Sequence, residues 1–247
     1  MNPLLEAMLR TGETRSADGA SHRLHSHISR GECEFVERLI AGDACIRRTL
    51  EVGCGYGVSS LAICGATRDR DGAAHTIIDP NQSTEWHDAG VAALRRAGLD
   101  HFVLIAEPSE FALPRLAQSA PGSCDLVFID GWHTFDHTLL DIFYADRLVR
   151  VGGYIVIDDV TMASVSKAVS CLATFPGYEA AGCAEDAAAT ASRTLARALM
   201  RALPRFTRQW LLPRAIAGRL DRACQPSMVA FRKAREAARH WSWFKDF

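Results

Sequence analysis

The sequence predicts a doubly wound α/β fold built on a mostly parallel sheet. Apolar runs of strand length alternate with stretches patterned as helices, which is typical of consecutive βαβ units. Each run is continuously apolar rather than alternating, as expected where helices cover both faces of a parallel sheet. The chain has 247 residues, which suffices for one substantial core. We therefore expect one α/β domain with additions.

The expected strands and helices follow one another in a regular order. Strands are expected at 48–52, 75–78, 102–106, 125–129 and 154–157, and helices near 58–66, 83–97, 109–119, 133–149 and 161–174. Ahead of the sheet, Ser29-Arg30-Gly31-Glu32 is a capping-box pattern that opens a further helix, which Gly42 closes. Residues up to about Ser29 are expected to form a polar lead. After a long interruption, residues 227–233 read as a strand that returns to the sheet.

The predicted organisation places an N-terminal lead and helix (1–47) over the active site of a core formed by 48–184 and 226–235. An Arg-rich helical insertion (185–225) interrupts the core, and an aromatic tail (236–247) ends the chain. The insertion carries eight arginines against three acidic residues. It is either a solvated helix face or a lid or partner surface that would attract an anionic acceptor, a membrane face or another subunit, as in a homo-oligomer.

Composition excludes several classes of function. The net charge is −1, so there is no general basic footprint for nucleic acid. The N-terminus lacks a basic region followed by an apolar run, and no stretch is long enough to span a bilayer, so we expect a cytoplasmic protein. The eight cysteines are scattered without zinc spacing and are expected to be reduced.

Three glycines spaced by single residues follow the first strand of the core and predict a turn shaped for a nucleoside ligand. The helix that begins at Val58 would direct its amino-terminal N–H groups to the same place. A dinucleotide fingerprint needs a third glycine where Val58 stands, so the spacing argues against an NAD-linked enzyme. The expected ligand-binding residues of this turn are Glu51, Gly53, Cys54, Gly55 and Gly57.

Acidic residues follow the later strands, at the sheet edge where open α/β folds bind ligands. Asp79 is placed to accept hydrogen bonds from ribose hydroxyls, or it is a turn residue in Asp79-Pro80-Asn81. Ser109 could cap the next helix and hold the adenine side of the pocket, or it serves only as a cap. Asp130, Asp158 and Asp159 either hold a divalent cation such as Mg²⁺ or serve separate orienting and capping needs.

Histidines supply two further candidates. His133, three residues after Asp130, could take a proton from an attacking hydroxyl, and His137 is the alternative. The cluster His22, His25 and His27 in the lead is expected to be solvated or to line an entrance, with a metal or substrate role as the alternative.

The ordered motifs together resemble class I S-adenosylmethionine (SAM) methyltransferases, most closely a bacterial methyltransferase-24-like group. They are Leu50-Glu51-Val52-Gly53, Ile78-Asp79-Pro80, Phe128-Ile129-Asp130-Gly131-Trp132-His133 and Val151-Gly152-Gly153-Tyr154-Ile155-Val156-Ile157-Asp158-Asp159. The resemblance implies a Rossmann-like sheet with a final antiparallel strand and SAM as cofactor.

More distant relatives refine the implied chemistry. Metal-dependent catechol-type O-methyltransferases have ligands that match Asp130 and Asp158, with an Asn in place of Asp159. Their catalytic lysine falls at His133, and a histidine base there is similar to sugar O-methyltransferases. The resemblance thus implies methyl transfer to a hydroxyl of a small molecule, a sugar or natural product. The alternative is a SAM-binding protein with a regulatory or assembly role through the Arg-rich insertion.

Overall fold

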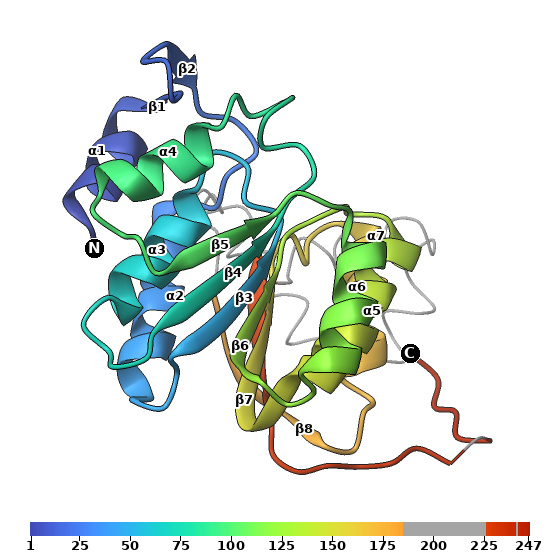
Figure 1. Cartoon of the computed structure of the whole chain (residues 1–247). Coiled ribbons are helices and arrows are strands. Elements are labelled where there is room, and N and C mark those ends of the chain that lie inside the picture. Colours follow the sequence, from blue (N-terminus) through green and yellow to red (C-terminus); the bar gives the residue numbers. More distant parts are fainter. Residues whose placement is uncertain (185–225, 241) are drawn as a thin grey trace, which may run out of the picture.

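The sheet predicted from the apolar runs is the centre of the computed structural model, which describes residues 1–184, 226–240 and 242–247 (Figure 1). Its seven strands follow the order β5-β4-β3-β6-β7-β9-β8. The strands are β3 (Arg48–Val52), β4 (Ala74–Ile78), β5 (Phe102–Ile105), β6 (Cys124–Ile129), β7 (Val149–Ile157), β8 (Tyr178–Ala184) and β9 (Met228–Lys233). Strands β3 to β7 pair in parallel, and β9 is antiparallel to both β7 and β8. The expected Rossmann-like sheet with a late antiparallel strand is confirmed.

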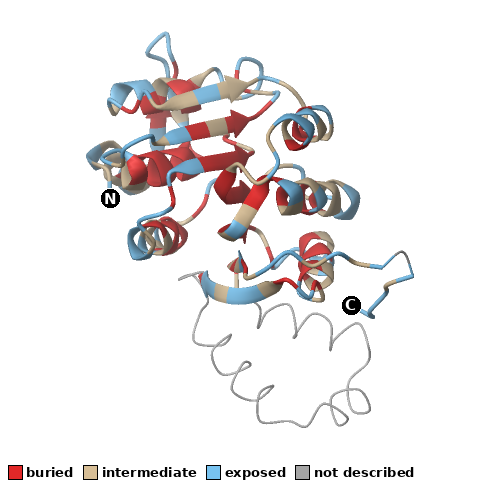
Figure 2. Ribbon diagram, turned by 60° about the horizontal axis from the view of Figure 1, so that its bottom comes forward, coloured by how far each residue is buried: buried red, intermediate tan, exposed pale blue. Residues whose placement is uncertain are grey.

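Helices cover both faces of the sheet and enclose two apolar cores (Figure 1). One face carries α1 (Pro3–Thr11), α2 (Arg30–Gly42), α3 (Val58–Thr67) and α4 (Ala89–Arg96), and the other carries α5 (Ser109–Ser119), α6 (Phe135–Leu148) and α7 (Ala163–Leu172). Side chains of a single strand serve both cores, because Phe128 faces one and Val127 the other. The central strands are correspondingly buried along their length (Figure 2).

The direction of the chain along the sheet reverses next to β3. From β3 the chain moves outward through β4 to β5 and then returns to the other side of β3 with β6. Ligands of open α/β sheets bind at the carboxyl ends of the strands at such a reversal. The glycine turn after β3 and Asp130 after β6 meet at this point.

Three local expectations were wrong, and one strand was missed. Ser109 does not cap α5, because it is the first residue of the helix and Pro108 stands at the N-cap without a side-chain hydrogen bond. The polar lead contains α1, whose apolar face buries Leu5 and Met8, and a hairpin of β1 (Glu13–Arg15) and β2 (Ser21–Arg23). Helix α4 begins only at Ala89, because residues before it form successive turns. Strand β8 was not expected, since its small residues give no apolar run.

The Arg-rich insertion (185–225) lies outside the described residues, so its expected helical character and its role as a lid or partner surface stay predictions.

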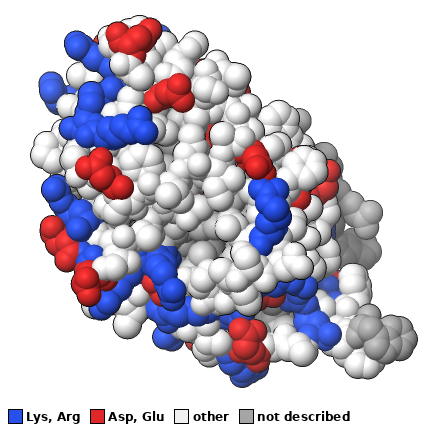
Figure 3. All heavy atoms as spheres, in the orientation of Figure 1, with Lys and Arg blue, Asp and Glu red and all other residues white. Residues whose placement is uncertain are grey.

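None of the helices in the described part of the chain is both long and apolar enough to cross a membrane. Among the described cysteines every thiol is free. On the face seen in Figure 3, acidic and basic side chains are interspersed, as the near-zero net charge suggests.

Candidate functional site

The glycine turn after β3 is fixed by close packing against its neighbours. Gly53 has φ +86° and Gly57 has φ +81°, and residues with a side chain rarely adopt such a backbone conformation. A Cβ on Gly53 would lie 2.0 Å from the carbonyl oxygen of Asp130, and one on Gly57 would lie 2.8 Å from Cα of Gly90. At Gly55 the nearest atoms are 4.0 Å away. The outer two glycines are therefore required by the loop after β6 and by α4, whereas the sequence suggested that they make room for a ligand.

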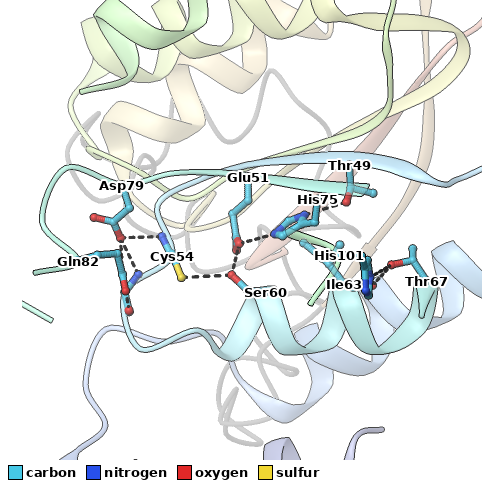
Figure 4. A network of polar contacts seen from close by, with 11 residues as sticks. Thr49, Glu51, Cys54, Ser60, Ile63, Thr67, His75, Asp79, Gln82 and His101 are labelled. Carbon is cyan, nitrogen blue, oxygen red and sulfur yellow. Dashed lines mark hydrogen bonds and ion pairs between the residues drawn. The ribbon is translucent and has the colours of Figure 1, made fainter. Parts of the chain in front are cut away.

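Asp79, directly after β4, holds the turn by hydrogen bonds (Figure 4). Its Oδ2 accepts the backbone N–H groups of Cys54 and Gly55, each at 3.0 Å, and the Gln82 amide at 2.9 Å. Its Oδ1 accepts the N–H of Asn81 at 2.8 Å, which is the turn interaction considered from the sequence. The side chain also lines the cavity described below, so its expected role at the ribose stays a prediction.

Glu51 is fully buried behind the turn and does not line that cavity (Figure 4). Its Oε2 lies 3.1 Å from Nε2 of His75 and accepts a hydrogen bond from the Ser60 hydroxyl. Nδ1 of His75 is 2.8 Å from the hydroxyl of Thr49, so the imidazole is held at both nitrogens. Within the described residues this network connects β3, β4 and α3, and it reaches the turn through the hydroxyl of Ser60, which donates to Sγ of Cys54 at 3.3 Å.

A cavity of 1410 Å³ opens over the carboxyl ends of the strands. The glycine turn, Asp79 and Ser109 form one part of its lining, and the residues after β6 and β7 form another. Residues 26–29 and Glu32 from the N-terminal region also line it. The cavity is larger than a typical small-ligand pocket and has room for a nucleoside and a second molecule.

Two of the expected strand-end aspartates meet at His133. Nε2 of His133 lies 3.1 Å from Oδ1 of Asp130 and 3.1 Å from Oδ2 of Asp159. The hydroxyl of Ser164, at the start of α7, donates to the carbonyl of His133 at 2.6 Å and fixes the loop. Asp159 has φ +54°, an unfavourable conformation for a residue with a Cβ, and this backbone turns its carboxylate toward His133.

Asp158 stands apart from this group. The described residues offer one metal-ligand group, Asp130, His133 and Asp159, whose ligand atoms lie within 4.8 Å of one another. The sequence instead suggested Asp130, Asp158 and Asp159. The side chain of Asp158 is buried, and its Oδ1 has no hydrogen-bond partner among the described residues. Neighbouring residues on a strand end point in different directions, which separates the two adjacent aspartates.

The acidic groups of the site raise one another's pKa. Burial, together with the charges of Asp159 and Glu51, raises the pKa of Asp130 to about 6, although His133 opposes the change. Burial and the charges of Asp130 and Glu32 raise the pKa of Asp158 well above its usual range. The hydrogen bond to Asp130 raises the pKa of His133. The site thus concentrates negative charge that an imidazolium or a bound cation would offset.

The three histidines of the lead separate in the structure. The His25 Nε2 lies 2.9 Å from the Tyr56 hydroxyl, and Trp86 packs beside both rings. His22 stacks on His87 at a ring distance of 4.6 Å, and His27 lines the cavity. The expected entrance-lining role therefore fits His27, and none of the three belongs to a metal-ligand group in the described residues.

Several residues around the site were missed by sequence reasoning. Tyr56 and Trp86 pack on each other beside the glycine turn, but Tyr56 stands at a variable position of the glycine motif and Trp86 in no motif. Glu32 was interpreted only as part of a capping box, which is indeed present. Asp141, on α6, is buried beside Ser109 and His137, and burial raises its pKa to about 7. Its place one helical turn after His137 was a signal that could have been used.

Known proteins share this architecture. The cofactor-bound protein Rv0187 from MTB is 18% identical with a TM-score of 0.61, and the match covers 96% of this chain and 92% of that one. An O-methyltransferase from Bacillus cereus in complex with SAH is 18% identical with a TM-score of 0.59, over 73% and 83% of the two chains. TomG from Streptomyces achromogenes, an O-methyltransferase in tomaymycin synthesis solved with SAM, is 19% identical with a TM-score of 0.57, over 73% and 82%. No curated protein matches the sequence significantly.

The sheet, the glycine turn and these neighbours define the fold of the class I SAM-dependent methyltransferases. Residues 50–160 match the methyltransferase-24 family, which is described as a methyltransferase domain. This stretch begins in β3 and ends just after Asp159, so it contains the turn and every strand-end acid discussed above. Residues 50–160 thus resemble a methyltransferase domain of the methyltransferase-24 type, as the motifs indicated.

Proposed function

We propose that the chain is an O-methyltransferase that moves the methyl group of SAM to a hydroxyl of a small molecule, a sugar or natural product. The observation that carries the proposal is His133, held between two carboxylates in the same cavity as the glycine turn. The solved O-methyltransferases from Bacillus cereus and Streptomyces achromogenes, which share the fold, support it.

The residues present suit SAM. The turn from Gly53 to Gly57, Asp79 and Ser109 lie along one side of the cavity, in reach of a nucleoside with an amino-acid arm. Tyr56 and Trp86 add aromatic faces beside the turn, and aromatic faces attract cations such as a sulfonium. SAM would supply the methyl group, and the protein would hold donor and acceptor in line, replacing an improbable bimolecular encounter.

His133 is the proposed general base. In its neutral form the imidazole would accept the proton of the acceptor hydroxyl, and the imidazolium that forms would be stabilised by Asp130 and Asp159. The ring is 33% exposed at the side chain, so it is reachable from the cavity. His137 also lines the cavity, but its Nδ1 lies 2.8 Å from the Thr134 hydroxyl and neither strand-end carboxylate contacts it.

The same three side chains also fit a divalent cation. Two carboxylates and an imidazole are a mixed oxygen and nitrogen donor set, which suits Mn²⁺ or Zn²⁺ better than Mg²⁺. A cation held by Asp130, His133 and Asp159 would lower the pKa of a bound hydroxyl. His133 would then be a ligand, and the effect of a chelator separates the two roles.

The test compares His133→Ala with the matched variant His137→Ala in a methyl-transfer assay over a panel of sugar and phenolic hydroxyl acceptors. We expect His133→Ala to bind SAM nearly as tightly as the parent and to lose roughly 10²- to 10⁴-fold in turnover, while His137→Ala keeps most of its activity. Unchanged turnover in His133→Ala removes this residue from the mechanism. Activity that disappears with a chelator and returns with Mn²⁺ assigns His133 to a metal site.

A further inference from the structure

The lining of the cavity is acidic. Seven carboxylate side chains line it: Glu32, Asp79, Glu85, Glu110, Asp130, Asp158 and Asp159. Within the described ranges no lysine or arginine does so, and the only titratable bases are His27, His133 and His137. Three of these carboxylates already have a described contact: Asp130 and Asp159 lie beside the proposed base His133, and Asp79 accepts hydrogen bonds from the glycine turn. Two others, Glu32 and Asp158, line the cavity without a role toward a ligand.

Glu32 and Asp158 come from different elements and are both buried. Glu32 stands in the first turn of α2 and is 6% exposed, while Asp158 follows β7 and is 7% exposed. One oxygen of Glu32, Oε2, accepts the N–H of Ser29 at 2.6 Å. Both side chains line the same cavity, so one ligand could reach the two carboxylates.

The partner of this pair is missing from the described residues. Oδ1 of Asp158 is buried without a hydrogen-bond donor, and an unpaired buried carboxylate is costly. A second metal ion is a poor fit, because the ligand group found among the described residues includes neither Glu32 nor Asp158. An ammonium group suits the pair better, since it has three N–H donors, carries positive charge and needs no fixed coordination geometry.

We propose that Glu32, in the first turn of α2, and Asp158, directly after β7, bind an ammonium group of the methyl acceptor in the cavity that both line. The proposal rests on the proposed function and narrows its acceptor to an amino alcohol such as an amino sugar. It opposes the expectation of an anionic acceptor, which rested on the Arg-rich insertion. The hydroxyl would lie toward His133 and the ammonium group toward α2.

The test measures binding of three matched sugars, D-glucosamine, N-acetyl-D-glucosamine and D-glucose, to the full chain saturated with SAH. Ligand-observed NMR at neutral pH gives the three dissociation constants. The variant Glu32→Gln removes one charge but keeps the capping box, because glutamine serves equally at this helix position. Glu34→Gln is the control, since Glu34 lies two residues further along the same helix with its side chain 47% exposed.

We expect glucosamine to bind at least about tenfold more tightly than either neutral sugar, as a charge-assisted hydrogen bond would provide. Glu32→Gln should abolish this preference, and Glu34→Gln should keep it. Equal binding of the three sugars, no detectable binding of any, or a preference that survives Glu32→Gln overturns the proposal. SAH binding is measured first: its absence contradicts the proposed function itself, whereas normal SAH binding without an ammonium preference contradicts only this inference.

Discussion

Replacing Gly53 with alanine tests how the turn is built. The new Cβ would lie 2.0 Å from the Asp130 carbonyl oxygen and 2.7 Å from its carbonyl carbon. Because carbon atoms at van der Waals contact lie near 3.5 Å, the backbone of Asp130 would have to move by about 1 Å. That backbone cannot move freely, since the N–H of Asp130 donates to the carbonyl of Val52 at 2.9 Å.

The expected cost has two parts. Overpacking against a backbone costs about 1–3 kcal/mol, and an alanine forced to the left-handed φ of Gly53 costs roughly 1–2 kcal/mol more. We therefore expect Gly53→Ala to lower the free energy of unfolding by about 3 kcal/mol. Gly55→Ala is the matched control, because its φ is +52° but no atom lies closer than 4.0 Å to the added carbon. Its cost should be only about 1 kcal/mol.

The assay is urea unfolding of the parent and both variants, followed by calorimetric titration with SAH. Gly53→Ala should also displace the carbonyl of Asp130 and weaken SAH binding severely, whereas Gly55→Ala should bind SAH more tightly than Gly53→Ala does. If the two variants differ by less than about 1 kcal/mol in unfolding free energy, close packing does not explain the first glycine and the reasoning is wrong.

Three further predictions concern buried and titratable groups. In NMR titrations with a chelator present, the pKa of His133 should lie above the usual histidine value, because the hydrogen-bonded carboxylate of Asp130 raises it. Asp130→Asn should therefore lower the pKa of His133, and an unchanged pKa in this variant contradicts the pairing. His75→Phe should lower the free energy of unfolding in urea by about 3 kcal/mol, because it leaves the carboxylate of Glu51 buried without its imidazole partner, and a loss below about 1 kcal/mol would show that the pair is dispensable. A thiol reagent followed by peptide mapping should modify the exposed cysteines first and reach the buried ones, whose pKa values are raised by burial, only on unfolding; rapid labelling of any buried thiol in the folded chain would disagree. The exposed pair is Cys45 and Cys183, and the buried set is Cys33, Cys54, Cys64 and Cys124.

The sheet could be predicted because its strands are long apolar runs, and their order in the chain fixes where their carboxyl ends lie. Strand β8 escaped notice because its residues are small and half-exposed, so that its pairing with β9 rather than its composition makes it a strand. Helix α1 escaped because its two buried side chains, Leu5 and Met8, lie in a short and otherwise polar segment.

The candidate site could be predicted as a set of residue types but not as a geometry. The sequence placed Asp130 and His133 together correctly, since both follow one strand closely. It could not choose between Asp158 and Asp159, because the backbone after the strand, including the left-handed φ of Asp159, orients the two carboxylates. Glu32 lies 98 residues before Asp130 in the chain, and only the tertiary fold brings it to the same cavity.

The most direct test of the central claim, a SAM site built on the glycine turn, is the thermal unfolding of the full chain with SAH and with NAD⁺. A ligand that binds only the folded state at about 100 times its dissociation constant adds about 2.7 kcal/mol of stability. We predict an increase in Tm of several degrees with SAH and none with NAD⁺. No increase with SAH, or an equal increase with NAD⁺, would contradict the claim.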